Sequence, residues 1–224
     1  MEPVLTLNVL STKAYNASLS KGWYEGESRS DSEIAQLIVS EIVEASEEVR
    51  NRKPKVYVVN DGKDCELEHL GFESCTVIGT TPEHPTENRI LKYLKPEGES
   101  IELADGLIRI GDYFGAHGLD LAQSMQQTGV VDKLNDLTLL QAARACEEFM
   151  GHQFTALRPL SAHLKIIRIL SHVDAGMSAR RAFGEAAVAI LAYAHLKGHD
   201  IEAAVKLKMK FNETRPHRHG NKAL

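Results

Sequence analysis

The chain has 224 residues, and 26 Lys and Arg against 31 Asp and Glu give a formal net charge of −5. With 43% hydrophobic and 25% charged residues, the composition is that of a soluble globular protein and excludes a disordered or fibrous chain. No apolar run approaches the roughly 18 residues of a membrane span, and the N-terminus lacks the pattern of a signal peptide. The three cysteines show no zinc-finger spacing, and the acidic balance disfavours a specific nucleic-acid partner. We therefore expect a reduced, cytoplasmic protein with no membrane partner.

The first half begins with a short apolar run and then a polar loop at 13–29, which contains the only tryptophan, Trp23. Ser30 stands three residues before Glu33, which is the spacing of a capping box. Apolar residues recur at helical spacing after this pair. The pattern predicts a helix that ends at about Asn51.

Residues 55–98 interrupt the helical pattern. Two β-prone runs at 55–59 and 76–78, an Asn-Asp-Gly turn and three prolines predict a small β-hairpin or irregular insertion. Helical spacing then resumes and predicts helices at about 100–118, 120–125, 136–151, 159–173, 178–197 and 200–211. The predicted fold class is therefore all-α with a small β insertion.

Two pairs of windows suggest an internal repeat. Residues 37–51 align with 137–151, and residues 104–121 align with 184–201 in the same order. The alignment predicts a degenerate tandem repeat of a four-helix unit, although chance similarity between amphipathic helices is the alternative. The predicted parts are a catalytic unit at 1–127, a second repeat at 136–205 and a basic tail at 206–224. An unrelated second helical domain, joined through 128–135, is the other possibility.

Two pairs of acidic residues carry the strongest chemical signal. Glu41 and Glu44 lie three positions apart, as do Glu102 and Asp105, so each pair shares one face of a predicted helix. Either pair alone is typical of a solvated helix face. Both pairs lie at the edge of an apolar stripe, however, and four facing acids would repel one another unless a cation lay between them. Oxygen ligands of this kind suit Mg²⁺ or Mn²⁺.

Together the two pairs resemble the E-x-x-E and E-x-x-D motifs of the MazG-like, all-α nucleoside triphosphate pyrophosphohydrolases. The resemblance extends to Lys21-Gly22-Trp23-Tyr24, to the residues around both pairs and to the tail KMKFNETRPHRHGNKAL, and it covers roughly half of the chain. The chain departs from the family in the long segment between the pairs. It also departs in its tail, which the second half separates from the first four helices.

The resemblance implies metal-dependent hydrolysis of a (d)NTP to a (d)NMP and pyrophosphate. Mg²⁺, which Mn²⁺ could replace, would be held by the four acids, and one acid could serve as general base. The expected nucleotide contacts come from Lys21, Trp23, Lys210, Asn212, Arg215 and Arg218. Trp23 would either stack on the base or serve as a partly buried structural indole. The family also implies a homodimer or a dimer-based tetramer. It includes phage proteins that clear one deoxynucleotide, which would act in the host cytoplasm.

Several alternatives stay open from the residues alone. A guanine nucleotide is the preferred substrate, but a dUTP- or dCTP-specific enzyme of the same fold is a rival. A nucleotide-binding regulatory module that does not hydrolyse is a second rival, and a basic-tailed nucleic-acid binder is a third. The repeat alignment predicts one active centre in each chain, because only one of the four acids remains in the second half, where Gln141, Arg144, Ala182 and Glu185 stand at the aligned positions.

Overall fold

The computed structural model describes residues 4–26, 28–60, 63–67, 95–129 and 134–217, and these are mainly helical. The helices are α1 (Leu7–Ser20), α2 (Asp31–Arg50), α4 (Glu99–Ala116), α5 (Leu121–Gln126), α6 (Leu139–Met150), α7 (Pro159–Leu170), α8 (Ala179–Leu196) and α9 (Ile201–Thr214), with a 3₁₀ turn at Gly151–Gln153. The strands are β1 (Tyr57–Asn60), β2 (Lys63–Glu66) and β3 (Pro96–Glu97). The predicted all-α fold with a small β insertion is confirmed.

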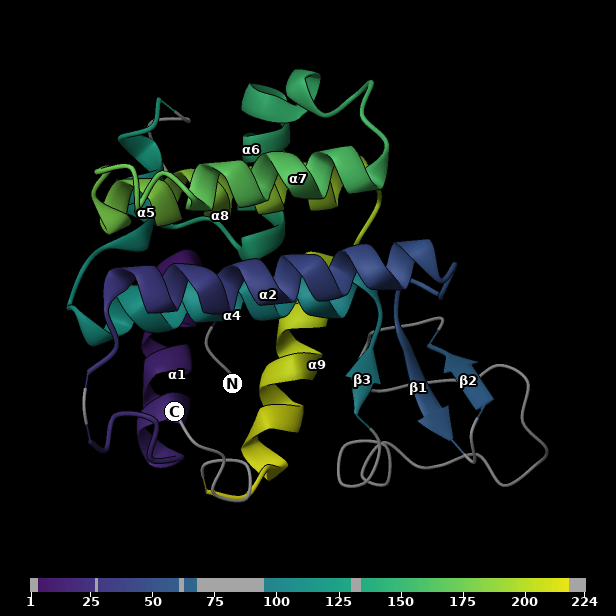
Figure 1. The fold of residues 1–224 in the computed structure, drawn as a ribbon, viewed down its shortest axis with the longest axis horizontal. Helices are drawn as coiled ribbons and strands as arrows, with labels where there is room; N and C mark the ends of the chain where they lie inside the picture. The colour runs from purple at the N-terminus through teal and green to yellow at the C-terminus, as the bar shows by residue number, and fades with distance from the viewer. Residues whose placement is uncertain (1–3, 27, 61–62, 68–94, 130–133, 218–224) are drawn as a thin grey trace.

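Helices α2 and α4 lie side by side and run antiparallel, and α7 and α8 lie beside them as a second pair (Figure 1). Helices α1 and α9 pack against α4, while α5 and α6 pack against α8. Buried apolar side chains from all these helices form one continuous cluster. No helix in the described part of the chain is long and apolar enough to cross a membrane.

Helix α1 corrects one expectation, because residues 13–20 are helical and do not belong to a loop. The Thr6 hydroxyl begins the helix by accepting a hydrogen bond from the Val9 amide at 3.3 Å. Serine, threonine and asparagine have modest helix propensity, which hid the pattern in the sequence. Close packing on α4 compensates for this, since a Cβ atom at Gly115 would lie only 2.5 Å from the Ser11 carbonyl oxygen.

The insertion contains an antiparallel sheet of strand order β2-β1-β3 in the described residues. Strand β3 leads directly into α4 through Gly98, whose φ of 114° favours glycine. A Cβ atom there would also lie 2.5 Å from the Lys55 carbonyl oxygen. The sheet thus fixes the start of α4. The second predicted strand, at 76–78, lies outside the described residues.

The packing of the helices repeats between the two halves of the chain. Helix α1 packs on α4 as α6 packs on α8, and α2 packs on α4 as α7 packs on α8. The two threonines that cap α1 and α6, Thr6 and Thr138, pair as an antiparallel bridge. After α4 and α8 the chain turns through Gly118 and Gly198, with φ of 62° and 70°, and Asp120 and Asp200 cap the next helices.

The helix contacts agree with one half of the repeat alignment and differ from the other half. The alignment of 104–121 with 184–201 matches α4 with α8, as the packing does. In contrast, the alignment of 37–51 with 137–151 matches α2 with α6, whereas the packing matches α2 with α7 and α1 with α6. Gln141 and Arg144 therefore do not occupy the places of Glu41 and Glu44. The similarity of those two windows reflects the amphipathic pattern that many helices share.

Candidate active site

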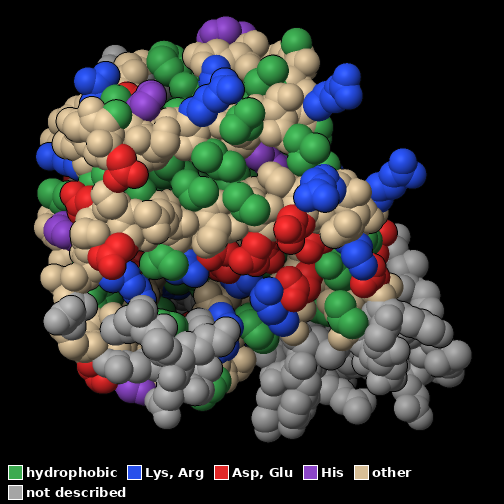
Figure 2. Space-filling model, in the orientation of Figure 1, with side chains coloured by type: hydrophobic (Ala, Val, Ile, Leu, Met, Phe, Trp, Pro, Cys, Tyr) green, Lys and Arg blue, Asp and Glu red, His purple; other side chains and the backbone are tan. Residues whose placement is uncertain are grey.

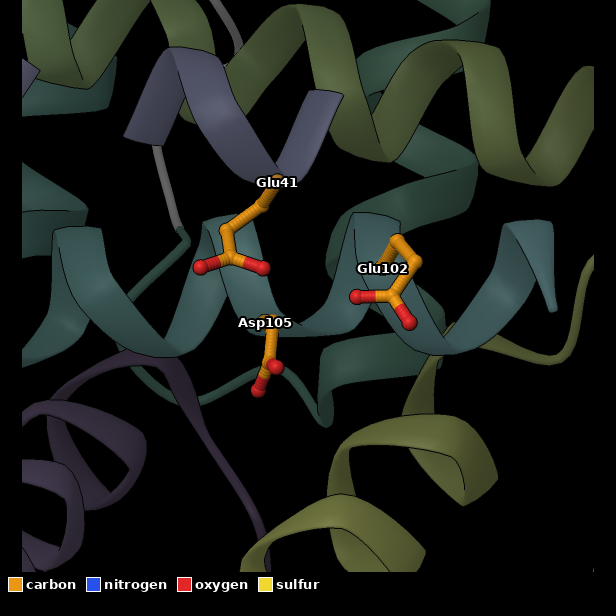
Figure 3. A group of neighbouring side chains, drawn as sticks. All are labelled: Glu41, Glu102 and Asp105. Atoms are coloured by element: carbon orange, nitrogen blue, oxygen red, sulfur yellow. The ribbon is translucent and has the colours of Figure 1, made fainter. Parts of the chain in front are cut away.

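Helices α2 and α4 bring three carboxylates together. The predicted capping box of Ser30 and Glu33 is present and begins α2. Oxygen atoms of Glu41, Glu102 and Asp105 all lie within 4.8 Å of one another. Figure 3 shows Glu41 reaching from α2 toward α4, where Glu102 and Asp105 lie about one turn apart. These three residues, the acid group below, are buried or half-buried although they are charged side chains.

The fourth predicted acid, Glu44, lies outside this group. Its side chain is exposed on α2, while Glu41 is only 5% exposed and Glu102 only 1%. Three positions along a helix correspond to about 300° of rotation, so a small roll of α2 toward α4 buries one acid and leaves the other in solvent. The i, i+3 spacing alone could not distinguish these two outcomes.

The acid group pairs with two cations that the sequence analysis did not single out. Arg109 Nε lies 2.6 Å from Glu41 Oε1, and Lys208 Nζ lies 2.7 Å from Asp105 Oδ2. Lys208 is 1% exposed, which is rare for lysine and requires a charged partner. Burial opposes its charge, but Asp105 and Glu102 outweigh this effect and raise the pKa of Lys208.

Glu102 differs from the other two acids in its hydrogen bonding. Its Oε2 atom is buried and has no hydrogen-bond partner among the described residues. Burial raises the pKa of Glu102 to about 8, although Lys208 opposes this shift. Burial likewise raises the pKa of Glu41, against the attraction of Arg109. Three carboxyl groups thus face two cations, and burial favours the protonated form of Glu102.

The donor set fits a hard divalent cation. It consists of carboxylate oxygens from two helices, and one of them, Glu102 Oε2, is buried without a partner in the part of the chain that the structure describes. Mg²⁺ and Mn²⁺ prefer ligands of this kind. A cation there would satisfy Glu102 Oε2 and would favour the ionised form of the carboxyl group. Figure 2 shows acidic side chains gathered along the exposed surface where α2 and α4 lie, with Lys and Arg among them.

A pocket of about 280 Å³ adjoins the acid group. Arg109 connects the two, because it lines the pocket and also pairs with Glu41. The pocket wall contains aromatic, apolar and polar side chains: Trp23, Tyr24, Ser28, Arg29, Ile34, Leu37, Arg109, Asp112, Tyr113 and His117. An aromatic pocket with a few polar groups is typical of small-molecule sites.

Asp112 is the acid in this wall, and both of its oxygens accept hydrogen bonds. The Tyr24 hydroxyl donates to Oδ1 at 2.8 Å, and the Ser18 hydroxyl donates to Oδ2 at 3.0 Å. Burial raises the pKa of Asp112, while these two hydrogen bonds and Arg109 oppose the shift. The hydroxyl groups hold the carboxylate in one orientation.

Three of the predicted nucleotide contacts, Trp23, Arg215 and Lys21, lie in different surroundings. Trp23 lines the pocket, with the Arg29 guanidinium 5.5 Å from its ring centroid. Arg215 is half-buried near the acid group: burial lowers its pKa, while Asp105 and Glu41 attract its charge. Lys21 instead donates to the carbonyl oxygens of Glu213 and Arg215, at 2.8 and 2.7 Å, and so holds the end of α9 in place.

The remaining predicted contacts lie on α9 or beyond it. Asn212 follows Lys208 by one turn, and its buried Oδ1 has no hydrogen-bond partner among the described residues. Lys210 is half-buried on the same helix. Arg218 lies outside the described residues, so the structure says nothing of its position.

The sequence pattern around Arg109 and Lys208 could have identified both residues, although the sequence analysis did not single them out. Arg109 follows Glu102 by seven positions and Asp105 by four, so the three share a helix face. Lys208 falls on the apolar stripe of α9 behind Ile201, where a solvated basic residue would not be placed. Asp112 carried no such signal, because its contacts with the 18–24 segment depend on tertiary packing.

Comparison of the chain with protein-family models, with curated proteins and with solved structures gives no match in any of the three. The resemblance to the pyrophosphohydrolases therefore rests on the residues quoted above.

Proposed function

We propose that the protein hydrolyses a nucleoside triphosphate to the monophosphate and pyrophosphate with the help of a divalent cation. The observation that carries this proposal is the acid group, with a Glu102 oxygen that has no hydrogen-bond partner among the described residues, next to buried Lys208, half-buried Arg109 and an aromatic pocket. Metal ligands, phosphate-binding cations and a base-sized pocket are the three parts that such a reaction needs.

The acid group would hold Mg²⁺ or Mn²⁺. When bound, the cation would supply charge neutralisation for the phosphate oxygens and an activated water molecule for attack at the α-phosphorus. The protein's own residues would bind and orient the substrate around this site. An acid of the group that is not fully committed to the metal would accept the proton from the attacking water.

Arg109, Lys208 and Arg215 are the cations placed to meet the triphosphate. Without substrate, Arg109 and Lys208 neutralise Glu41 and Asp105. A metal ion on these carboxylates would weaken both ion pairs and leave the two cations available to phosphate oxygens. Arginine could then contact a phosphate with two parallel hydrogen bonds. Trp23 would stack on the base in the pocket.

A non-hydrolysing nucleotide-binding module is the second candidate, and one observation favours it. Arg109 and Lys208 already compensate two of the three acids, which is the arrangement that a metal-free binding site would have. The unpaired oxygen of Glu102 is not explained by that function. A dUTP- or dCTP-specific hydrolase would share the acid group and differ only in the pocket.

We further propose that the second half serves as an internal partner of the first. Helix α7 packs on α2 and α9 packs on α4, so elements of the second half complete the surroundings of the acid group. Exposed apolar side chains remain on the outer surface at Val43, Leu160 and Leu164. These residues favour the proposed pairing of two chains into a homodimer.

The experiment that tests the proposed function is a screen of all common (d)NTPs with the purified protein, with Mg²⁺, with Mn²⁺ and with a chelator. Products are separated by ion-exchange chromatography. We expect a monophosphate and pyrophosphate with metal, and no product with chelator. A diphosphate and orthophosphate, or binding of nucleotide without any product, would refute the proposal, and the second result would favour the binding module.

A further inference from the structure

The pocket beside the acid group contains one acidic side chain, and it could distinguish between bases. Its other walls are mainly aromatic or apolar, and rings stack on such walls without strong preference, while Ser28 and His117 add single polar groups. Arg29 and Arg109 carry positive charge and suit phosphates or a ring face. Asp112 is the acidic side chain among the lining residues, and an ionised carboxylate only accepts hydrogen bonds.

Asp112 retains acceptor capacity after its internal contacts are counted. A carboxylate offers about four lone-pair positions on its two oxygens. Tyr24 uses one position on Oδ1 and Ser18 uses one on Oδ2. Each oxygen therefore retains one position. Because Asp112 lines the pocket and is held there from two sides, it presents a pair of parallel acceptors of fixed orientation.

The Watson–Crick edges of the bases respond differently to such a pair. Guanine offers two neighbouring donors, the N1 hydrogen and the 2-amino group, and these match the two oxygens. Adenine and cytosine offer one donor next to an acceptor, and the acceptor would face a carboxylate oxygen. Thymine and uracil offer one donor between two carbonyl oxygens, which a carboxylate would repel.

We infer that Asp112 selects a guanine nucleotide by accepting two hydrogen bonds from the edge of its base. This inference rests on the proposed function for the location of the triphosphate, but the base pocket can be tested separately. Tyr24 and Ser18 are then positioning residues, because they orient Asp112 and do not read the base themselves. Trp23 forms part of the same pocket and would stack on the selected ring.

The test uses the fluorescence of Trp23, which is the only tryptophan of the chain and lines the pocket. The full-length protein is titrated without metal with dGMP, dAMP, dCMP and dTMP. We expect dGMP to quench the fluorescence at concentrations at least about tenfold lower than the other three, since a good bidentate pair discriminates by that much or more. This measurement needs no turnover, so it remains valid if the protein does not hydrolyse nucleotides.

The matched variant is Asp112→Asn, which keeps the shape and replaces one acceptor by a donor. We expect it to lose about ten- to hundredfold in apparent affinity for dGMP. Its affinity for dAMP and dCMP should stay the same or rise, because an amide matches a donor next to an acceptor. Asp136→Asn, an exposed acid in a turn, serves as the control and should behave as the wild type.

Two results would overturn the inference. One is equal quenching of the wild type by all four nucleotides, which decides the question even if Asp112→Asn fails to fold. The other is a loss in Asp112→Asn that is the same for every base. Failure of the proposed function looks different: no (d)NTP would release pyrophosphate, while the ranking of the monophosphates could still favour guanine.

Discussion

Glu102 is the residue on which the proposed chemistry depends most. It is 1% exposed, its Oε2 atom lacks a hydrogen-bond partner in the described structure, and burial raises its pKa to about 8. Such a group is unfavourable for folding, since an unsatisfied buried carboxyl group costs free energy. Its presence therefore indicates a purpose other than stability. Perturbed carboxyl groups in clefts are typical of functional sites.

We expect Glu102→Gln to lower pyrophosphate release at saturating Mg²⁺ by at least about hundredfold, because it removes a metal ligand. The melting temperature should stay the same or rise, since the variant removes a buried acid that pairs with no cation among the described residues. Steady-state kinetics and calorimetry measure both effects. Glu47→Gln, an exposed acid on α2, is the control. Near-wild-type turnover of Glu102→Gln would remove Glu102 from the site.

Asp105 should behave differently from Glu102 because it pairs with buried Lys208. From the sequence we would expect removal of either acid to relieve repulsion and to leave the fold intact. The ion pair reverses this expectation for Asp105→Ala, which leaves a buried ammonium unpaired and should lower the free energy of unfolding by about 3 kcal/mol. Adding Lys208→Met to this variant should restore most of the lost free energy of unfolding.

Urea unfolding measures the three free energies. The control is Glu185→Ala, because Glu185 occupies the position of Asp105 in the second half and pairs with exposed Arg181. That change should cost less than about 1 kcal/mol. Equal stabilities for Asp105→Ala and the wild type would show that the Lys208 pair is not needed for folding.

A second buried network links the two halves and makes stability depend on pH. His199 Nδ1 lies 2.7 Å from the Ser100 hydroxyl, and its Nε2 lies 3.6 Å from Glu99 Oε2. Tyr193 and His163 also contact Glu99 Oε1, at 2.6 and 3.1 Å. Burial lowers the pKa of His199 to about 4, although Glu99 attracts its proton. The ring is therefore neutral in the folded protein at pH 7.

The unfolded chain binds the His199 proton at about pH 6.5, well above the folded pKa. Stability from this residue is thus fully present above pH 6.5 and is lost as the pH falls toward 4. We expect His199→Gln to be less stable than the wild type at pH 7 but to lose less stability between pH 6.5 and 4. Thermal unfolding across this range tests it, with exposed His152→Gln as control. Parallel pH profiles for wild type and His199→Gln would contradict the assignment.

At the scale of single elements, the sequence predicted the helix ends that local interactions determine. The capping box at Ser30 begins α2, and Gly118 and Gly198 follow α4 and α8, as their sequence patterns indicate. Helix α1 was missed because its stability comes from burial against α4 and not from propensity. The same limit applies to the site: spacing identified both acidic pairs, but only packing decides that Glu44 is exposed.

Helix α9 carries the basic residues that would meet the phosphates. Arg215 follows the helix directly, and Lys21 holds its backbone carbonyl oxygen. We expect Arg215→Ala to lower kcat/KM by about thirtyfold, on the order of 2 kcal/mol for a lost charge-assisted contact. Lys206→Ala is the control, because Lys206 pairs with Glu202 on the same helix. Unchanged kinetics in Arg215→Ala would show that the end of α9 does not contact the substrate.

At the scale of the whole molecule, the helix packing relates two halves, and among the described residues the acid group lies in the first half. In the second half, Ala182 and Glu185 replace Glu102 and Asp105 on α8, and Glu185 pairs with Arg181. The sequence alignment predicted the loss of one of these two acids on α8. It could not identify α7 as the counterpart of α2, because the packing of helices, and not residue identity, defines that relation.

A crystal of the protein soaked in Mn²⁺ tests most directly whether the acid group is a metal centre. Manganese scatters anomalously, so each bound ion is located without reference to activity. We expect anomalous peaks only beside Glu41, Glu102 and Asp105. Peaks near Glu185 and Arg181, or no peak at the acid group with Mn²⁺ saturating, would contradict a single metal centre built by α2 and α4.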